Sequence, residues 1–177
     1  MGTLNVGGGT LSFDSSGNWT SAPPGTIIQV QSVKIGPTTQ TITSVSPTLI
    51  TGQSINFTPK SASSKIISNI SISTNNNFVS SYALYQNGSS ILSTAGFANS
   101  NQPNMDITQY LSTNTNDNNM MSVYFQSILD AGSTAQRNYA VYATSGWVNT
   151  PLPLVINNRA NSDMASFSTM VIYEVSQ

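Results

Sequence analysis

The chain of 177 residues holds neither cysteine nor histidine, and only 6% of its residues are charged, with a formal net charge of -1. The missing residue types exclude disulfides, thiolate zinc sites and any nucleophile that a histidine activates. Because an ordinary domain carries about 25% charged residues, this surface must consist largely of Ser, Thr, Asn, Gln and Gly. The five dispersed Lys and Arg residues give no electrostatic case for binding nucleic acid or an anionic membrane.

The length suits one domain that can bury a core without covalent staples, preceded by a short appendage. Residues 1–25 are rich in glycine and carry a few separated apolar side chains: Leu4, Val6, Leu11, Phe13 and Trp19. Two very short strands are expected at 4–6 and 10–13, and strands this short cannot bury those side chains among themselves. We therefore predict an anchoring or stem segment at 1–25, ended by Pro23-Pro24-Gly25, and a head domain at 26–177.

The first half of the head domain reads as strands at 26–35, 40–45 and 47–51, followed by a pair of runs at 54–58 and 65–74. A polar turn around Pro59-Lys60-Ser61 joins the pair, which predicts a buried hairpin. Ile70 and Ile72 alternate with polar residues, as in a strand with one buried face. The adjacent Ile66 and Ile67 break this alternation, which indicates a sheet centre or a bulge.

The second half continues with strands expected at 78–86, 89–94, 105–111, 120–128, 139–143, 151–156 and 165–175. Asn87-Gly88 is a type I′ hairpin signal between the first two. The last half of 165–175 is apolar on both faces, which predicts a place in a sheet centre or at a subunit contact. No apolar stripe has helical spacing, so the chain predicts an all-β sandwich or barrel. We favour an antiparallel β-sandwich, jelly-roll-like, with a short extended N-terminal segment.

Residues that could carry chemistry are few. The six carboxylates are spread along the chain, mostly in predicted turns where Asp bonds its own backbone. The loop 114–119 could offer oxygen ligands to calcium, although it lacks the acidic residue that ends an EF-hand loop. Trp19, Trp147 and seven tyrosines could stack on sugar rings, whereas aromatic residues more often pack in cores and subunit interfaces. We predict no catalytic residue, no metal and no cofactor.

Several stretches in order resemble the small β-rich head or knob domains of virion fibre and surface proteins from marine tailed phages, cyanophages in particular. They are 24–30 (PGTIIQV), 48–50 (TLI), 55–66 (INFTPKSASSKI), 84–89 (LYQNGS), 158–159 (NR) and 165–175 (ASFSTMVIYEV). The most specific elements are the stretch 58–66 and the closing strand with its glutamate. Residues 1–23 resemble the short stem that precedes such heads.

The resemblance implies a non-enzymatic virion structural protein, a homotrimer that is attached to another virion protein through residues 1–25. Its expected role is host attachment as a fibre or knob, with a host surface glycan as a possible partner. The alternatives are capsid decoration as a cement or head-fibre protein and, less favoured, a depolymerase of surface polysaccharide. No signal peptide is visible, and no apolar run approaches the ~20 residues that cross a bilayer. We expect synthesis in the host cytoplasm, release by lysis and a place on the virion surface.

Overall fold

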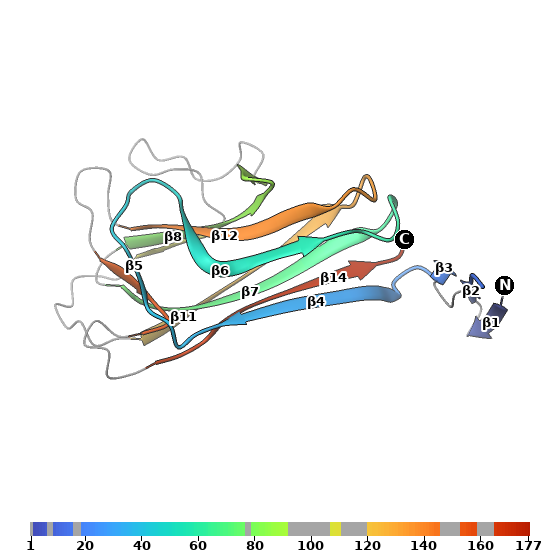
Figure 1. Cartoon of the computed structure of the whole chain (residues 1–177), viewed down its shortest axis with the longest axis horizontal. Coiled ribbons are helices and arrows are strands. Elements are labelled where there is room, and N and C mark those ends of the chain that lie inside the picture. The colour runs from blue at the N-terminus through green and yellow to red at the C-terminus, as the bar shows by residue number, and fades with distance from the viewer. Residues whose placement is uncertain are drawn as a thin grey trace.

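The computed structural model describes residues 2–6, 9–15, 19–76, 79–91, 107–110, 120–145, 153–158 and 165–177. All regular elements in these ranges are strands, and they form three sheets (Figure 1). The smallest sheet holds β1 (Gly2–Val6), β2 (Gly9–Phe13) and β3 (Trp19–Ser21) in that order. The two short strands expected at 4–6 and 10–13 are thus present, and the segment predicted to be extended forms an antiparallel sheet.

Two larger antiparallel sheets pack face to face and form the sandwich. In the first sheet β7 is central, with β11 on one side and with β14 and β13 on the other; β4 lies beyond β14, and β5 beyond β13. In the second sheet the order is β10-β8-β12-β6, with β9 paired to β8. The bounds are β4 Ile27–Ile35, β5 Gln40–Ile42, β6 Thr48–Phe57, β7 Lys65–Asn76, β8 Val79–Gln86, β9 Ser89–Ser90, β10 Ile107–Tyr110, β11 Met120–Asp130, β12 Arg137–Ser145, β13 Leu154–Ile156 and β14 Ser168–Val175.

The strand order identifies a jelly roll. If β4, β6, β7, β8, β10, β11, β12 and β14 are counted from one to eight, the first sheet runs 1-8-3-6 and the second runs 2-7-4-5. Successive strands thus change sheets at every step except from the fourth to the fifth, β8 to β10, which are neighbours in the second sheet, and this is the strand order of a jelly roll. The predicted all-β, jelly-roll-like sandwich is confirmed.

The predicted hairpin at 54–58 and 65–74 is wrong. Strand β6 pairs with β12 in the second sheet, whereas β7 pairs with β11, β13 and β14 in the first. Residues 58–64 cross from one sheet to the other, and both strands turn their buried apolar residues, such as Phe57 in β6 and Ile70 in β7, toward the space between the sheets. Two adjacent apolar runs with a polar turn fit this corner as well as a hairpin, so their spacing could not separate the two arrangements.

The runs expected separately at 47–51 and 54–58 are one strand, β6, with a bulge in the middle. Its pairing with β12 shifts between Ser54–Ala140 and Leu49–Tyr142, and Gly52 has a positive φ of 81° at this point. Glycine adopts this backbone at no steric cost, so β6 bends sharply without ending (Figure 1).

Strand β7 is regular, and no bulge occurs at Ile66 and Ile67. Ile66 points into the core and Ile67 lies on the outer face, and the pairing with β11 runs without a shift from Lys65 to Asn75. The alternative prediction, a sheet centre, is confirmed. The Asn87-Gly88 turn is also confirmed, because both residues have positive φ, 52° and 78°, as a type I′ hairpin requires.

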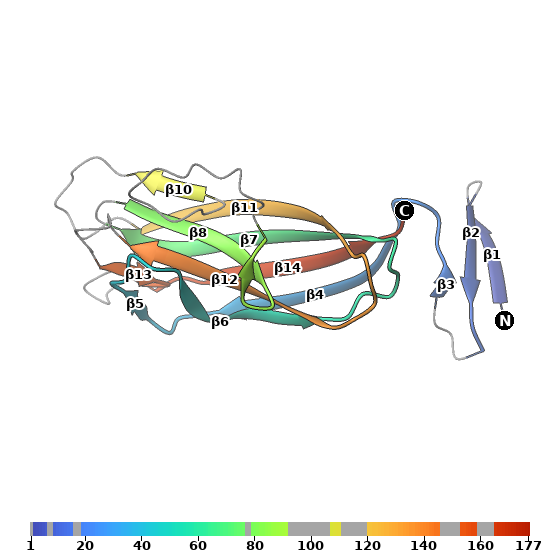
Figure 2. The ribbon, with the colours of Figure 1, turned by 90° about the horizontal axis from the view of Figure 1, so that it is seen from above.

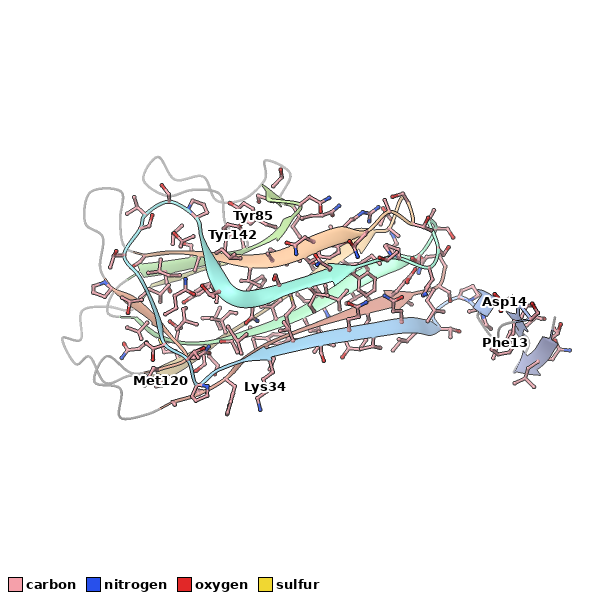
Figure 3. All side chains as sticks on the ribbon, in the orientation of Figure 1. Phe13, Asp14, Lys34, Tyr85, Met120 and Tyr142 are labelled. Carbon is pink, nitrogen blue, oxygen red and sulfur yellow. The ribbon has the colours of Figure 1, made fainter. Side chains whose placement is uncertain are left out.

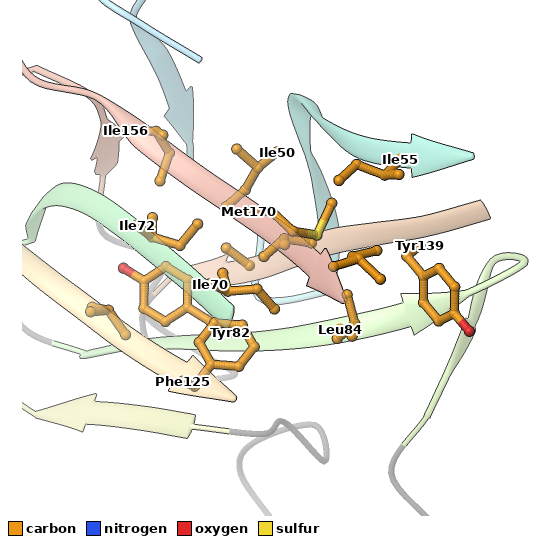
Figure 4. Close-up of a cluster of buried hydrophobic side chains, with 14 of the residues drawn as sticks. Ile50, Ile55, Ile70, Ile72, Tyr82, Leu84, Phe125, Tyr139, Ile156 and Met170 are labelled. Atoms are coloured by element: carbon orange, nitrogen blue, oxygen red, sulfur yellow. The ribbon is translucent and has the colours of Figure 1, made fainter. Parts of the chain in front are cut away.

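The core fills the space between the two sheets (Figure 4). Its fully buried side chains come from both sheets, including Ile70 and Ile72 of β7, Tyr82 and Leu84 of β8, and Met170 of β14. Burial of such side chains stabilises the fold by roughly 1.5–3 kcal/mol each.

Candidate functional site

The predicted anchoring residues lie in the N-terminal sheet, which sits beyond the end of the sandwich where β14 finishes (Figure 2). Leu4 of β1 lies directly opposite Leu11 of β2, and Phe13 is paired with Trp19 of β3. Leu4 is 55% exposed, whereas Leu11 and Phe13 are half-buried. The side chains of Val6 and Trp19 lie outside the described part of the structure. The sheet thus brings Leu4 and Leu11 together, with Leu4 left open to a partner.

Hydrogen bonds fix the point at which this sheet joins the sandwich. The Gly25 amide donates to the Ser176 carbonyl at 2.9 Å, and the Ser176 amide donates to the Thr26 carbonyl at 2.9 Å. The Ser176 hydroxyl donates to the Pro23 carbonyl. The link is therefore held against the end of β14, and both the entry and the exit of the sandwich lie at the same end.

An apolar row crosses the outer face of the first sheet. Val30 of β4 is paired with Tyr173 of β14, Tyr173 with Ile67 of β7, and Ile67 with Ile128 of β11. Val30 and Ile128, on the two edge strands, are 52% and 60% exposed, and the two central residues are half-buried. Residues directly opposite in neighbouring antiparallel strands touch on the same face, so the four form one continuous strip. We call it the apolar row.

Polar and charged groups border this row. On one side Gln126 of β11 donates to the Asn69 side chain of β7 at 2.7 Å. On the other side Lys65 and Asp130 form an ion pair. Further along the same face lies Lys34 (Figure 3). Its ammonium is 3.8 Å from the centre of the exposed Phe167 ring. An apolar centre with a polar rim is the usual composition of a protein interface.

A buried carboxylate is the residue that sequence reasoning missed. Glu174 of β14 is fully buried, and its carboxylate accepts hydrogen bonds from the Lys60 amide at 2.8 Å, the Ser61 amide at 2.9 Å and the Ser64 hydroxyl at 2.7 Å. It thereby holds the corner 58–64 against the closing strand. The sequence did contain a signal for this burial. Alternate residues of a strand point to the same face, so Glu174 points inward like Met170 and Ile172.

The carboxylates and aromatic residues do not assemble a reaction centre in the described ranges. Glu174 serves the corner and Asp130 pairs with Lys65, and no group of three metal-ligating side chains occurs among the described residues. Tyr82 and Tyr139 belong to the core, while Tyr85 and Tyr142 stack at 4.1 Å between ring centres (Figure 3). Trp147 and the calcium-loop candidate 114–119 lie outside the described residues.

Two further observations bear on the class of protein. Within the described part of the chain, no helix is long and apolar enough to cross a membrane. No protein-family model matches the chain, and a search of curated proteins finds no match.

Proposed function

We propose that this chain is a non-enzymatic structural protein of a bacteriophage particle, displayed on the virion surface as a fibre head or knob for host attachment. The sequence resemblance to phage head domains supports the proposal, and its two most specific stretches are those that Glu174 joins. The jelly roll also supports it, because viral coat domains and lectins use this architecture. A fold alone does not fix function, so the proposal also depends on the surfaces of the molecule.

The observation that carries the proposal is that the two ends of the molecule differ in structure. The N-terminal sheet, with Leu4 exposed, lies at the end where the sandwich begins and finishes, and β5 and β13 lie at the opposite end (Figures 1 and 2). A head that is held by one end presents its other end outward. Residues 1–25 would accordingly bind another virion protein.

The apolar row supports self-association into the homotrimer that the resemblance implies. A row of four apolar residues with a polar border would be shielded if the outer faces of the first sheets met around a three-fold axis. Neutral packing suits this contact, since the row itself carries no charge. The same contact would cover the edge strands β4 and β11, which otherwise offer unpaired backbone groups.

The test is particle association of paired variants. Leu4→Asp with Leu11→Asp places two charges on the apolar pair, and Thr3→Asp with Ser12→Asp places them on the adjacent cross-strand pair as the control. We expect the tagged chain to copurify with phage particles from infected cells, with at least a tenfold loss for the leucine variant only. Failure of the unaltered chain to copurify would refute the particle role. Equal copurification of both variants would refute anchoring through Leu4 and Leu11.

A further assay separates attachment from capsid decoration. Host attachment predicts that the purified head domain binds host cells and competes with infection. Decoration predicts binding to the capsid lattice and no binding to cells.

A further inference from the structure

The apolar row reaches both edges of the first sheet. Its end residues, Val30 of β4 and Ile128 of β11, are 52% and 60% exposed, whereas Tyr173 and Ile67 between them are half-buried. Protein interfaces usually have an apolar centre and a polar rim. Across the strands this order is reversed, because the apolar side chains that are most open to a partner lie at the two ends of the row. A partner that covered only the middle of the face would leave these ends in water.

The exposed ends of the row favour a ring of copies over a face-to-face pair. Two copies packed face to face would bury Tyr173 and Ile67 and would leave Val30 and Ile128 at the rim of the contact. In a ring, strand β11 of one copy lies beside strand β4 of the next copy, so each end of the row meets the other end of a neighbouring row. A contact between two different surfaces of one chain closes into a ring when the rotation between copies allows it.

The width of the sheet sets the number of copies. At the level of the row the sheet is four strands wide, from β4 through β14 and β7 to β11 (Figure 1). Four strands and one more strand spacing at the corner give each side of the ring a length of about 19 Å. The centre of a triangle with this side lies about 5.5 Å from each sheet, close to half of the ~10 Å between two packed sheets. Three faces therefore fill the centre with side chains, whereas the centre of a square would lie about 9.5 Å away and stay hollow.

The two edges are complementary at the levels beyond the apolar row. Rotation about a three-fold axis along the strands keeps every residue at its own height, so each level of one copy continues into the same level of the next. The level after the row ends in Gln126 on β11 and Ser32 on β4, an amide and a hydroxyl that can share a hydrogen bond. The following level ends in Tyr124, 61% exposed, and Lys34, an aromatic ring and a cation. Both edges thus suit a second copy of this chain as the partner.

We propose that three copies close head to tail into a ring in which β11 of each copy lies beside β4 of the next, with Ile128 against Val30 of the next copy. The inference deepens the self-association in the proposed function and rests on it, and it adds which edges meet and in which register. Because the axis runs along the strands, the three N-terminal sheets lie at the same end of the ring (Figure 2). Three exposed Leu4 side chains then offer a larger apolar anchor than one.

The test is cysteine crosslinking of the purified full chain, which has no cysteine of its own. Val30→Cys combined with Ile128→Cys places one thiol on each edge, and a disulfide forms only when the two Cβ atoms come within about 4.5 Å. We expect this double variant to give a covalent trimer on non-reducing electrophoresis. Each single variant should stay uncrosslinked, because each edge meets the other edge and never itself. Val30→Cys combined with Tyr124→Cys is the matched control, since four residues of β11 displace the second thiol by about 13 Å.

All three substituted side chains are exposed, so the variants should keep the circular dichroism spectrum of the unaltered chain. Covalent dimers from a single-cysteine variant would show a two-fold contact and would overturn the inference. Absence of crosslinks in the double variant, equal crosslinking in the control, or products larger than a trimer would also overturn it. An uncrosslinked chain that still sediments as a trimer would leave self-association standing. The particle-association test alters neither edge, so the particle role is decided separately.

Discussion

The buried carboxylate of Glu174 leads to the sharpest stability prediction. Glu174→Ala would remove the acceptor for two backbone amides and one hydroxyl in the corner 58–64, and would leave a cavity beside them. Hydrogen bonds to a charged group contribute about 1.5–3 kcal/mol each and are not additive, and an exposed amide such as that of Lys60 can recruit water. We therefore expect a loss of about 3–5 kcal/mol in the free energy of unfolding.

Glu174→Gln tests the electrostatic part of this reasoning. The Lys60 amide donates to both carboxylate oxygens, so the amide oxygen of Gln can replace Oε1 and accept from Lys60, Ser61 and Ser64, but the NH2 group in place of Oε2 then faces the Lys60 amide. We expect a smaller loss, about 1–2 kcal/mol, because charge assistance and one acceptor disappear.

The assay is equilibrium unfolding in urea followed by circular dichroism. Asp130→Asn is the matched control, since its side chain is 78% exposed in an ion pair and should change stability by at most about 0.5 kcal/mol. A loss below about 1 kcal/mol for Glu174→Ala, or equal losses for Ala and Gln, would refute the reasoning.

Three further predictions concern the core, the bulge and the outer face. Burial raises the pKa of Tyr82 above its ordinary 10.0, so the free energy of unfolding should fall as pH rises above 10.0, and Tyr82→Phe should reduce that slope in alkaline urea titrations. Gly52→Ala should lower the free energy of unfolding by about 1–2 kcal/mol or more, because its Cβ would lie 3.0 Å from the Ile35 side chain. Gly132→Ala, also at positive φ but in open space, should lower the free energy of unfolding less in the same assay. Ile128→Lys should convert a trimer to monomers in analytical ultracentrifugation. Gln126→Lys, at the next outward-facing position of β11, should leave the trimer intact. An unaltered chain that sediments as a monomer would contradict self-association.

The fold was predictable where a pattern is local. The alternation in β14 and the Asn87-Gly88 turn each specify their own backbone, so strand and hairpin were both correct. The partner of a strand is not local. The corner 58–64 depends on Glu174, more than a hundred residues later, and the sequence does not show which sheet receives each strand.

The apolar residues of 1–25 were visible without a fold, because they lie in a glycine-rich stretch, and their anchoring role stays a prediction. The pairing of Leu4 with Leu11 became visible only with the register of β1 and β2.

The adjacent pair Ile66 and Ile67 connects these observations. Ile66 is buried in the core, and Ile67 lies in the apolar row on the opposite face of β7. A central strand that faces water on one side needs an apolar residue at only one of these two positions. On the outer face the neighbours continue the pattern, because Tyr173, Val30 and Ile128 extend the row to both edges, whereas the inner face beside Ile66 holds the carboxylate of Glu174. A sheet whose inner face covers the core and whose outer face carries an apolar row has the pattern of a layer that is covered on both sides, and the second covering layer proposed for this protein is another copy of itself.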